Sequence, residues 1–424
     1  MRCRFALGIV LGLVCLASGA GLQSAANAAA DEPSAVVERV KKLGGEIRYD
    51  AQKTIVGVDL LECRGTDADV KLLTSLGDLR QLALWGAEIT DAGVQRLAAF
   101  TKLDELVLEN TEVTDAGLQV LAKLPQLKSL NLRRSTHMTD AGLAYVKALP
   151  NLEHLSLLYN NVTNAGLADL RGLKKLKLLD LRGCVQVSDA GLMEIKGLTN
   201  LKSLKLRNPA LTDAGLAYLS GLTRLTSLSI EDAQITDAGL EVLGKLTKLE
   251  DLSVFRCYNV SDDCFAAMKK LTHLNKLAVR DTPISATGLA QVKDAKGLKK
   301  LDLEETQAND EGMGCVAAFA ELQWLNLWHT RITDAGLEPL LALKDLKYLN
   351  LTDTKIGDAG LAALGKMTSL ETLNLNQTKI TDDGLKQLSH LAHLKSLTVV
   401  QTEVTAEGAK RLQRALPKCK VKQL

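Results

Sequence analysis

The sequence has few aromatic residues and no excess of charge of either sign. Only 3% of its 424 residues are Phe, Trp or Tyr, and 52 basic residues stand against 50 acidic ones. If Arg2 and Arg4 leave with an N-terminal leader, the basic and acidic totals are equal at 50 each. A chain that binds nucleic acid usually carries a strongly basic face, so this balance argues against nucleic acid as a partner.

Motifs of the common enzyme classes are also missing. The sequence contains no Gly-rich phosphate loop, no G-x-S-x-G nucleophile motif and no C-x-x-C pair. His390 and His393 are three residues apart with no further ligand nearby, which favours a solvated pair over a metal site. We therefore expect a non-catalytic protein with no metal site and no cofactor.

Residues 1–30 are predicted to be a secretory signal peptide. Arg2 and Arg4 precede a short apolar run over residues 5–20, and segment 26–30 offers two A-x-A cleavage sites. The run contains glycine and serine and is shorter than the roughly 20 residues that span a bilayer. Because no second apolar run of that length follows, we expect an exported protein (periplasmic, envelope-associated or secreted) with no transmembrane segment after cleavage.

Beyond the leader, one phrase recurs along the chain. The sequence Ile-Thr-Asp-Ala-Gly-Leu at 332–337 has near copies that begin at positions 113, 211 and 235. Its glycine position recurs every 24 residues, except for three intervals of 25 that end at Gly142, Gly191 and Cys264. Fifteen such coils follow one another without a gap, from Asp69 to Gly408. An array of this kind grows in one dimension and needs no second core.

The residue pattern of one coil predicts its local structure. Leu349 and Leu351 alternate with polar residues, as in a short strand with one buried face. Thr333 is a natural N-cap, and Asp334 places a negative charge in the first helical turn, where the helix dipole favours it. Thr or Ser occupies the N-cap position in 13 of 15 coils. We expect Gly336 where the helix start passes too close to the neighbouring coil for a side chain.

The coils resemble those of leucine-rich repeat proteins, which have periods of 20–29 residues and an L-x-x-L-x-L core. The 25-residue coils match the cysteine-containing subtype of F-box protein repeat domains, as in the residues Leu179, Leu181, Cys184, Val187, Ser188, Asp189, Gly191 and Leu192. The uniform coils also resemble exported or envelope-associated bacterial repeat proteins. This resemblance implies an α/β horseshoe of about 15 coils, with a parallel sheet inside and helices outside, that mostly serves as a binding scaffold.

The domain boundaries follow from where the repeat pattern begins and ends. We predict a signal peptide at 1–30, an N-terminal cap at 31–52, the solenoid at 53–415 and a C-terminal cap at 416–424. In the N-terminal cap, Ser34 is expected to N-cap a helix over residues 35–43. No F-box-like segment is expected before the repeats, so a ubiquitin-ligase role is not carried over from the resemblance.

Cysteines occupy repeat positions rather than the spacings of a disulfide framework. Cys63, Cys184 and Cys257 lie just after a strand, where threonine is usual, and Cys264 replaces the repeat glycine. Side chains in separate coils rarely meet Cβ to Cβ, so we expect mostly buried thiols that act as small apolar groups. The short separation of Cys257 and Cys264 leaves a disulfide open for that pair.

The strand residues that flank the inward leucines should form columns about 4.8 Å apart on the concave sheet. All three tryptophans fall there, in a chain poor in aromatic residues. The candidate binding residues on this face are Trp85, Phe255, Arg280, Trp324, Asn326, Trp328, Tyr348 and Asn350. Rigid aromatic side chains beside amides suit peptide or sugar recognition. The alternative is that the aromatic rings cover one another or pack on the stems of Lys300 and Arg280.

A second group of concave residues is basic and consists of Arg133, Arg182, Lys205 and Arg207. It could contact an acidic partner, but Asp180 and Glu231 are close enough to neutralise it, which favours ordinary solvated charge. The leading hypothesis is an exported, non-catalytic scaffold that binds a protein or peptide through its concave face. The alternatives are a glycan-binding module that uses the same aromatic and Asn residues and, more remotely, an F-box-like substrate-recognition domain.

Overall fold

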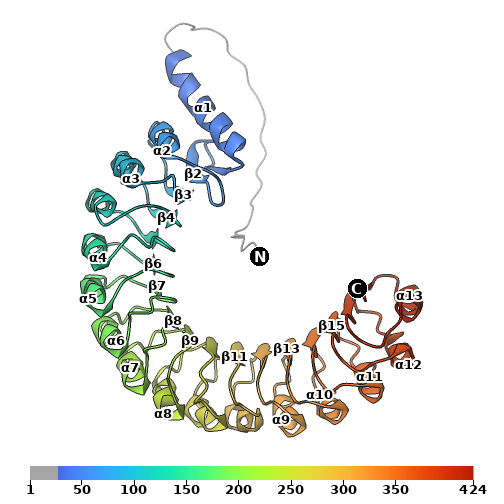
Figure 1. Ribbon diagram of the computed structural model, residues 1–424. Helices are drawn as coiled ribbons and strands as arrows, with labels where there is room; N and C mark the ends of the chain where they lie inside the picture. Colours follow the sequence, from blue (N-terminus) through green and yellow to red (C-terminus); the bar gives the residue numbers. More distant parts are fainter. Residues whose placement is uncertain (1–26, 424) are drawn as a thin grey trace.

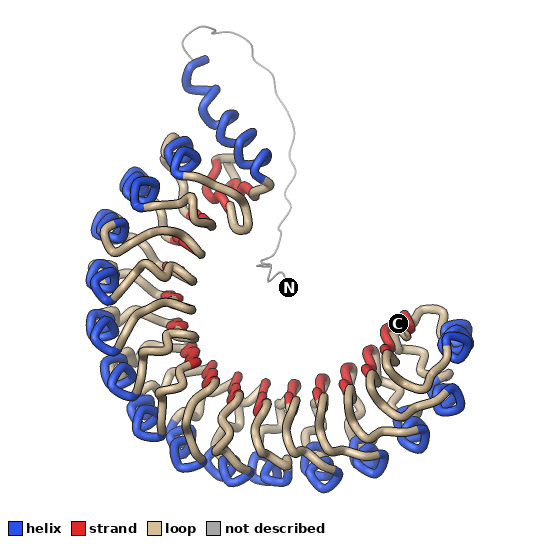
Figure 2. The backbone as a smooth tube through the Cα atoms, in the orientation of Figure 1, coloured by secondary structure: helices blue, strands red, loops and turns tan. Residues whose placement is uncertain are grey.

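The computed structural model describes residues 27–423, which form one open horseshoe (Figure 1). Strands line the inner side of the horseshoe and short helical segments line its outer side (Figure 2). The sheet has 17 strands. β1 pairs antiparallel with β2, and from β2 to β17 each strand pairs in parallel with the next one along the chain. The predicted α/β solenoid with an inner sheet and outer helices is confirmed.

The strands are β1 (Glu46–Tyr49), β2 (Ile55–Asp59), β3 (Gln81–Trp85), β4 (Glu105–Glu109), β5 (Ser129–Asn131), β6 (His154–Ser156), β7 (Leu178–Asp180), β8 (Ser203–Arg207), β9 (Ser227–Glu231), β10 (Asp251–Phe255), β11 (Lys276–Arg280), β12 (Lys300–Asp302), β13 (Trp324–Asn326), β14 (Tyr348–Asn350), β15 (Thr372–Asn374), β16 (Ser396–Thr398) and β17 (Lys420–Lys422).

The α-helices are α1 (Asn27–Leu43), α2 (Asp67–Leu73), α3 (Asp91–Val94), α4 (Asp140–Val146), α5 (Asn164–Leu167), α6 (Asp189–Ile195), α7 (Asp213–Ala217), α8 (Asp237–Leu240), α9 (Asp310–Val316), α10 (Leu337–Leu340), α11 (Asp358–Leu364), α12 (Asp382–Leu385) and α13 (Ala406–Ala415). The 3-10 helices are η1 (Gln95–Ala99), η2 (Gly117–Lys123), η3 (Ala168–Gly172), η4 (Tyr218–Gly221), η5 (Glu241–Lys245), η6 (Asp262–Met268), η7 (Thr287–Val292), η8 (Asp334–Gly336) and η9 (Lys386–Leu388).

The first helix is longer than the sequence predicted. α1 begins at Asn27 rather than at residue 35, so Ser34 lies inside the helix and is not its N-cap. The alanine-rich segment 28–30 has a high helix propensity and extends the helix toward the N-terminus. Most of the predicted signal peptide, residues 1–26, lies outside the described residues.

Asp69 replaces the repeat glycine in the first coil and links that coil to α1. Its buried carboxylate accepts hydrogen bonds from Arg39 Nε at 2.6 Å and from the backbone N–H of Thr66 at 2.9 Å. Burial alone would raise the pKa of Asp69, but the hydrogen bonds from Arg39 and Thr66 outweigh it and hold that pKa below its usual value. Within the described residues α1 rather than another coil precedes this one, and Asp69 forms an ion pair with Arg39 of that helix.

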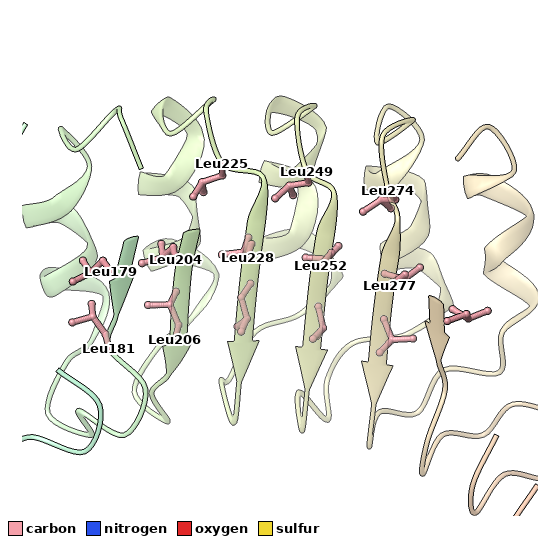
Figure 3. Close-up of a cluster of buried hydrophobic side chains, with 14 of the residues drawn as sticks. Leu179, Leu181, Leu204, Leu206, Leu225, Leu228, Leu249, Leu252, Leu274 and Leu277 are labelled. Atoms are coloured by element: carbon pink, nitrogen blue, oxygen red, sulfur yellow. The ribbon is translucent and has the colours of Figure 1, made fainter. Parts of the chain in front are cut away.

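The inward leucines of successive strands form one continuous core (Figure 3). Leu349 is fully buried, and in the sheet register it lies between Leu325 and Leu373 of the neighbouring coils. Several turns after a strand add a buried threonine, such as Thr354, whose hydroxyl donates to the carbonyl oxygen of Leu351 at 2.6 Å. The hydroxyls of Thr282, Thr306, Thr330 and Thr378 make the same bond to the backbone of their own turns.

The repeat aspartate binds the next coil, which the sequence analysis did not predict. Asp310 accepts a hydrogen bond from the backbone N–H of Thr333 at 2.7 Å and another from its hydroxyl at 2.6 Å. A Cβ added at Gly336 would lie 2.5 Å from Asp310 Oδ1, so the glycine gives room to the aspartate of the preceding coil. The dipole explanation of the aspartate is therefore incomplete, because the carboxylate also joins two coils.

The same bond recurs through most of the solenoid. The other pairs with both hydrogen bonds are Asp67 and Thr90, Asp91 and Thr114, Asp115 and Thr139, Asp140 and Thr163, Asp189 and Thr212, Asp213 and Thr236, Asp237 and Ser261, Asp262 and Ser285, Asp358 and Thr381, and Asp382 and Thr405. Each of these carboxylates thus accepts two hydrogen bonds from the next coil.

The series of aspartates that bind the next coil, here called the aspartate ladder, is interrupted at Ala286. This residue has a positive φ of 74° and no carboxylate, and Asn309 of the following coil instead caps its own helix by accepting from the Gly312 N–H at 3.2 Å. The ladder resumes in the next coil, where Asp310 binds Thr333. The core continues through this junction, since Ala286 and Ala308 are both buried.

The six cysteines within residues 27–423 are free thiols. Cys184 and Cys257 are fully buried, and burial raises the pKa of the Cys184 thiol to about 12 and that of Cys257 to about 11. Cys184 Sγ donates to the carbonyl oxygen of Leu157 at 3.0 Å. These two thiols stay protonated near neutral pH and are poor nucleophiles.

Candidate binding surface

The sheet register places the exposed strand residues of neighbouring coils side by side on the concave face. Lys300, Trp324, Tyr348 and Thr372 lie in one column, and Asp302, Asn326, Asn350 and Asn374 lie in the next. In the third column Phe255 pairs with Arg280, and Glu304 and Trp328 occupy the equivalent positions of the next two coils. We call the group Phe255, Arg280, Asp302, Glu304, Trp324, Asn326, Trp328, Tyr348 and Asn350 the concave patch.

Trp324 and Tyr348 stack on each other. Their ring centroids are 4.9 Å apart and their planes differ by 8°. The Tyr348 hydroxyl accepts a hydrogen bond from Asn374 Nδ2 at 3.2 Å, and both rings remain half-buried. The predicted column is confirmed, and so is the alternative that aromatic rings cover one another, as far as this pair is concerned. The stack forms one broad, rigid aromatic surface.

Phe255 is covered by two guanidinium groups. The Cζ atoms of Arg256 and Arg280 lie 4.6 Å and 4.5 Å from its ring centroid. Such cation–π contacts are favourable, and they hold the Arg280 stem against the aromatic ring. The structure therefore brings the predicted residues Phe255 and Arg280 together, but the ring is less accessible than the sequence suggested.

Asn326 is buried, whereas the sequence placed it among the exposed residues of the concave face. It is 5% exposed, and its Nδ2 donates to Asp302 Oδ1 at 2.9 Å and to Glu304 Oε2 at 2.8 Å. Its Oδ1 accepts from the backbone N–H of Trp328 at 3.2 Å. With both amide protons used, Asn326 positions two carboxylates and a tryptophan. Asn350 differs, because its Oδ1 is used by Thr352 while its Nδ2 donates no hydrogen bond within the described part of the chain.

Asp302 and Glu304 are acidic residues of the patch that the sequence analysis missed. Burial raises the pKa of both carboxyl groups, and the neighbouring Asp302 charge adds to the effect on Glu304. Arg280 approaches them only to 3.8 Å and 3.9 Å. A signal was present in the sequence, since alternation around Leu301 and Leu303 turns both acidic side chains toward the face that carries the tryptophans.

Trp85 does not belong to the concave patch. It ends β3 and pairs with Glu109 of β4, whereas Trp324 begins β13 in the other half of the horseshoe (Figure 1). Nine strands separate β3 from β13 in the sheet. Trp85 therefore lies on the concave sheet as predicted, but residues on the same face of distant coils do not form one patch.

The predicted basic patch is largely neutralised by acidic neighbours. Arg182 donates to Asp180 at 2.8 Å, Arg133 lies 3.1 Å from Glu109, and Arg207 donates to Asp232 at 2.5 Å. Hydrogen bonds to Asp180 and Asp232 raise the pKa values of Arg182 and Arg207. Lys205 lies on β8 and forms no ion pair with any residue from 27 to 423. These contacts favour the alternative of ordinary solvated charge.

A groove of about 760 Å³ runs beside the concave face, where the strands end in turns. Its lining includes the acidic side chains of Glu305 and Asp353 and the basic side chains of Arg331, Lys355 and Lys379. Its remaining acidic residue, Asp281, binds Arg256 at 3.3 Å, and Asp353 binds His329 at 2.5 Å. The groove presents both signs of charge, and its lining contains no Phe, Trp or Tyr ring. It therefore indicates the chemistry of a ligand less clearly than the concave patch does.

Comparisons with known proteins agree with this architecture. Family models described as leucine rich repeat match residues 320–380 and, for a second model, residues 148–170, 172–196 and 222–244. A solved leucine-rich repeat protein from Leptospira interrogans is similar with a TM-score of 0.56 and 22% identity, covering 83% of this chain and 86% of that one. An internalin from Listeria monocytogenes has a TM-score of 0.48 and 20% identity, covering 93% and 95%.

The chain thus has the fold of a leucine-rich repeat solenoid, and the leucine rich repeat models match four of its segments. Such arrays typically act as binding scaffolds through their extended concave surface. No curated protein matches the sequence, and at 22% identity the Leptospira structure supports the fold alone. In the described residues, no helix is both long enough and apolar enough to cross a membrane.

Proposed function

We propose that the protein is a non-catalytic scaffold that binds a protein or peptide through the concave patch. The observation that carries this proposal is the stacked Trp324–Tyr348 pair, which lies half-exposed on the concave sheet of a chain with only 3% aromatic residues. Large rigid side chains of this kind dominate binding energies at protein interfaces. Trp328, also half-exposed, lies in the same coil as Trp324 and widens the surface.

The double variant Trp324→Ala/Trp328→Ala should lose at least about 30-fold in affinity for a partner isolated from the native source, because hot-spot truncations cost about 2 kcal/mol or more. Affinity would be measured by surface plasmon resonance on the purified full chain. Trp85→Ala is the matched control, since it removes a tryptophan from a similar position in a distant coil, and it should bind like the wild type. Equal affinity of the double variant and the wild type would remove the concave patch from consideration.

Glycan binding is the second candidate, and one observation favours it. The free Nδ2 of Asn350 lies on the same strand as Tyr348, so an amide donor stands beside an aromatic surface. That combination suits a sugar ring, which stacks and hydrogen-bonds at once. A glycan array separates the two candidates: saturable binding that Trp324→Ala abolishes would favour the glycan over the peptide.

Export is the third part of the proposal. It is supported by the basic start at Arg2 and Arg4, the short apolar run over residues 5–20 and the alanine-rich segment 26–30. Cleavage after Ala28 or Ala30 would fall within the first turns of α1. N-terminal sequencing of the protein recovered outside the cytoplasm would show a start near residue 29 or 31, whereas a start at Met1 would contradict the signal peptide.

A further inference from the structure

Two carboxylates lie at the centre of the concave patch, held by a shared amide. Asp302 is about nine-tenths buried and Glu304 is half-buried. The Asn326 Nδ2 donates to one oxygen of each, at 2.9 Å and 2.8 Å. A single neutral donor group between two acids fixes their positions without cancelling either charge.

The resident cations compensate these charges incompletely. Arg280 is the nearest, at 3.8 Å from Asp302 and 3.9 Å from Glu304, beyond hydrogen-bond distance, and it lies on the ring of Phe255. Lys276 also acts on Asp302 from β11, while Glu305 and Asp302 itself act on Glu304 with the opposite sign. Across the sheet, Tyr348 is the titratable group of β14 that feels both acids. The environment as a whole disfavours the ionised carboxylates.

That environment has a consequence for stability. A carboxyl group whose pKa is raised on folding costs stability at pH values above its folded pKa, and the cost disappears once the pH falls below its unfolded value. Burial raises the pKa of both Asp302 and Glu304 in this way. Near neutral pH the two ionised carboxylates therefore lower the stability of the free protein. A bound cation would offset this loss.

Aromatic rings flank the carboxylates in the next coil. Trp324 precedes Asn326 by two residues and Trp328 follows it by two, so the rings stand in the columns on either side of the amide that holds the acids. The face of an indole ring attracts a cation, and a guanidinium group stacks on it particularly well. The concave patch thus combines two carboxylates with neighbouring indole rings, and both kinds of group attract a cation.

We propose that the concave patch recognises an arginine side chain of its peptide partner, which inserts between Trp324 and Trp328 and pairs with Asp302 and Glu304. This inference rests on the proposed peptide-binding function and names the chemistry of the partner. A planar guanidinium has five donors and can serve two carboxylates while it stacks on an indole ring. An acidic side chain would meet two acids that Arg280 compensates only in part, and a neutral one would leave the remaining charge uncompensated.

The test begins with a phage-displayed library of random 12-residue peptides selected on the full chain at neutral pH. Selected peptides are expected to share an arginine. The affinity of the best peptide would then be measured by fluorescence anisotropy on the wild type and on Asp302→Asn/Glu304→Gln, which keeps the side-chain shapes. The variant should bind about tenfold or more weakly, because a charge-assisted pair is lost.

The matched control is Glu231→Gln/Asp251→Asn. It removes the same two charges from the same concave face, on β9 and β10, and should change the affinity by less than about twofold. A double-mutant cycle between the peptide arginine and the two carboxylates then tests the contact directly. Replacing the peptide arginine with alanine should weaken binding to the wild type about tenfold or more and should weaken binding to Asp302→Asn/Glu304→Gln much less. Circular dichroism spectra of the variants verify that each is folded.

Several outcomes would overturn the inference. A library that yields no binder, selected peptides without arginine, or equal losses in the carboxylate variant and its control each contradict it. If Trp324→Ala/Trp328→Ala abolishes peptide binding while Asp302→Asn/Glu304→Gln binds normally, the peptide-binding function stands and the arginine site falls. If neither variant affects binding, both proposals fall.

Discussion

Replacing Leu349 with alanine is expected to lower the free energy of unfolding by about 2–5 kcal/mol. Leu349 is fully buried on β14, with Leu325 and Leu373 beside it in the adjacent strands. The change removes apolar contact and leaves a cavity that borders three coils, and the stacked strands cannot collapse into it without shifting the sheet register. Loss at one coil therefore weakens both of its neighbours.

A denaturant melt would measure the loss, with Lys347→Ala as its control. Lys347 is exposed in the same coil, and its truncation should change stability by less than about 0.5 kcal/mol. A long array need not unfold in one step, so amide hydrogen exchange should be followed as well. Relative to the wild type, exchange in Leu349→Ala should become faster in β13 and β15 and stay unchanged in β3. A silent Leu349→Ala would show that the core position was assigned to the wrong residue.

The period of the sequence made the fold predictable. A repeat of 24 or 25 residues sets which leucines face inward, and parallel pairing of identical strands then aligns equivalent positions. The predicted column of Trp324 and Tyr348 followed from this register and is confirmed by their stacking. Local rules also identified Thr333 as an N-cap, whose hydroxyl accepts from the Ala335 N–H at 3.4 Å.

The side-chain partnerships between coils were harder to predict. Asp310 could satisfy a helix dipole in its own coil or a threonine in the next, and the periodic sequence fits both. Asn326 looked like a surface amide because its burial depends on Asp302 and Glu304, one coil earlier in the chain. Trp85 shares its repeat position with Trp328, but nine strands lie between β3 and β13. Periodicity fixes a position in the repeat, while these features depend on which particular side chains are neighbours.

The substitution Gly336→Ala tests the bond between coils, because two effects predict opposite signs. Gly336 has a φ of −68°, a helical value that alanine adopts readily, and helix propensity alone would make the change stabilising by about 0.5–1 kcal/mol. Packing opposes it, since the new Cβ would lie 2.5 Å from Asp310 Oδ1. Moving Asp310 away would break its two hydrogen bonds to Thr333. We expect packing to win, with a net loss of about 1–3 kcal/mol in a denaturant melt.

The control is Gly314→Ala in α9, where an added Cβ would meet no atom within 4 Å, so only the propensity gain remains. The decisive step is to repeat Gly336→Ala in the Asp310→Ala background. Asp310→Ala alone should cost about 1–3 kcal/mol, because the Thr333 N–H loses its partner. Once the carboxylate is absent, the nearest remaining atom of residue 310 is its Cα at 3.3 Å, and Gly336→Ala should become neutral or stabilising. A change of sign between the two backgrounds would show that the glycine exists to admit the aspartate, whereas an equal loss in both would assign the glycine a purely backbone role.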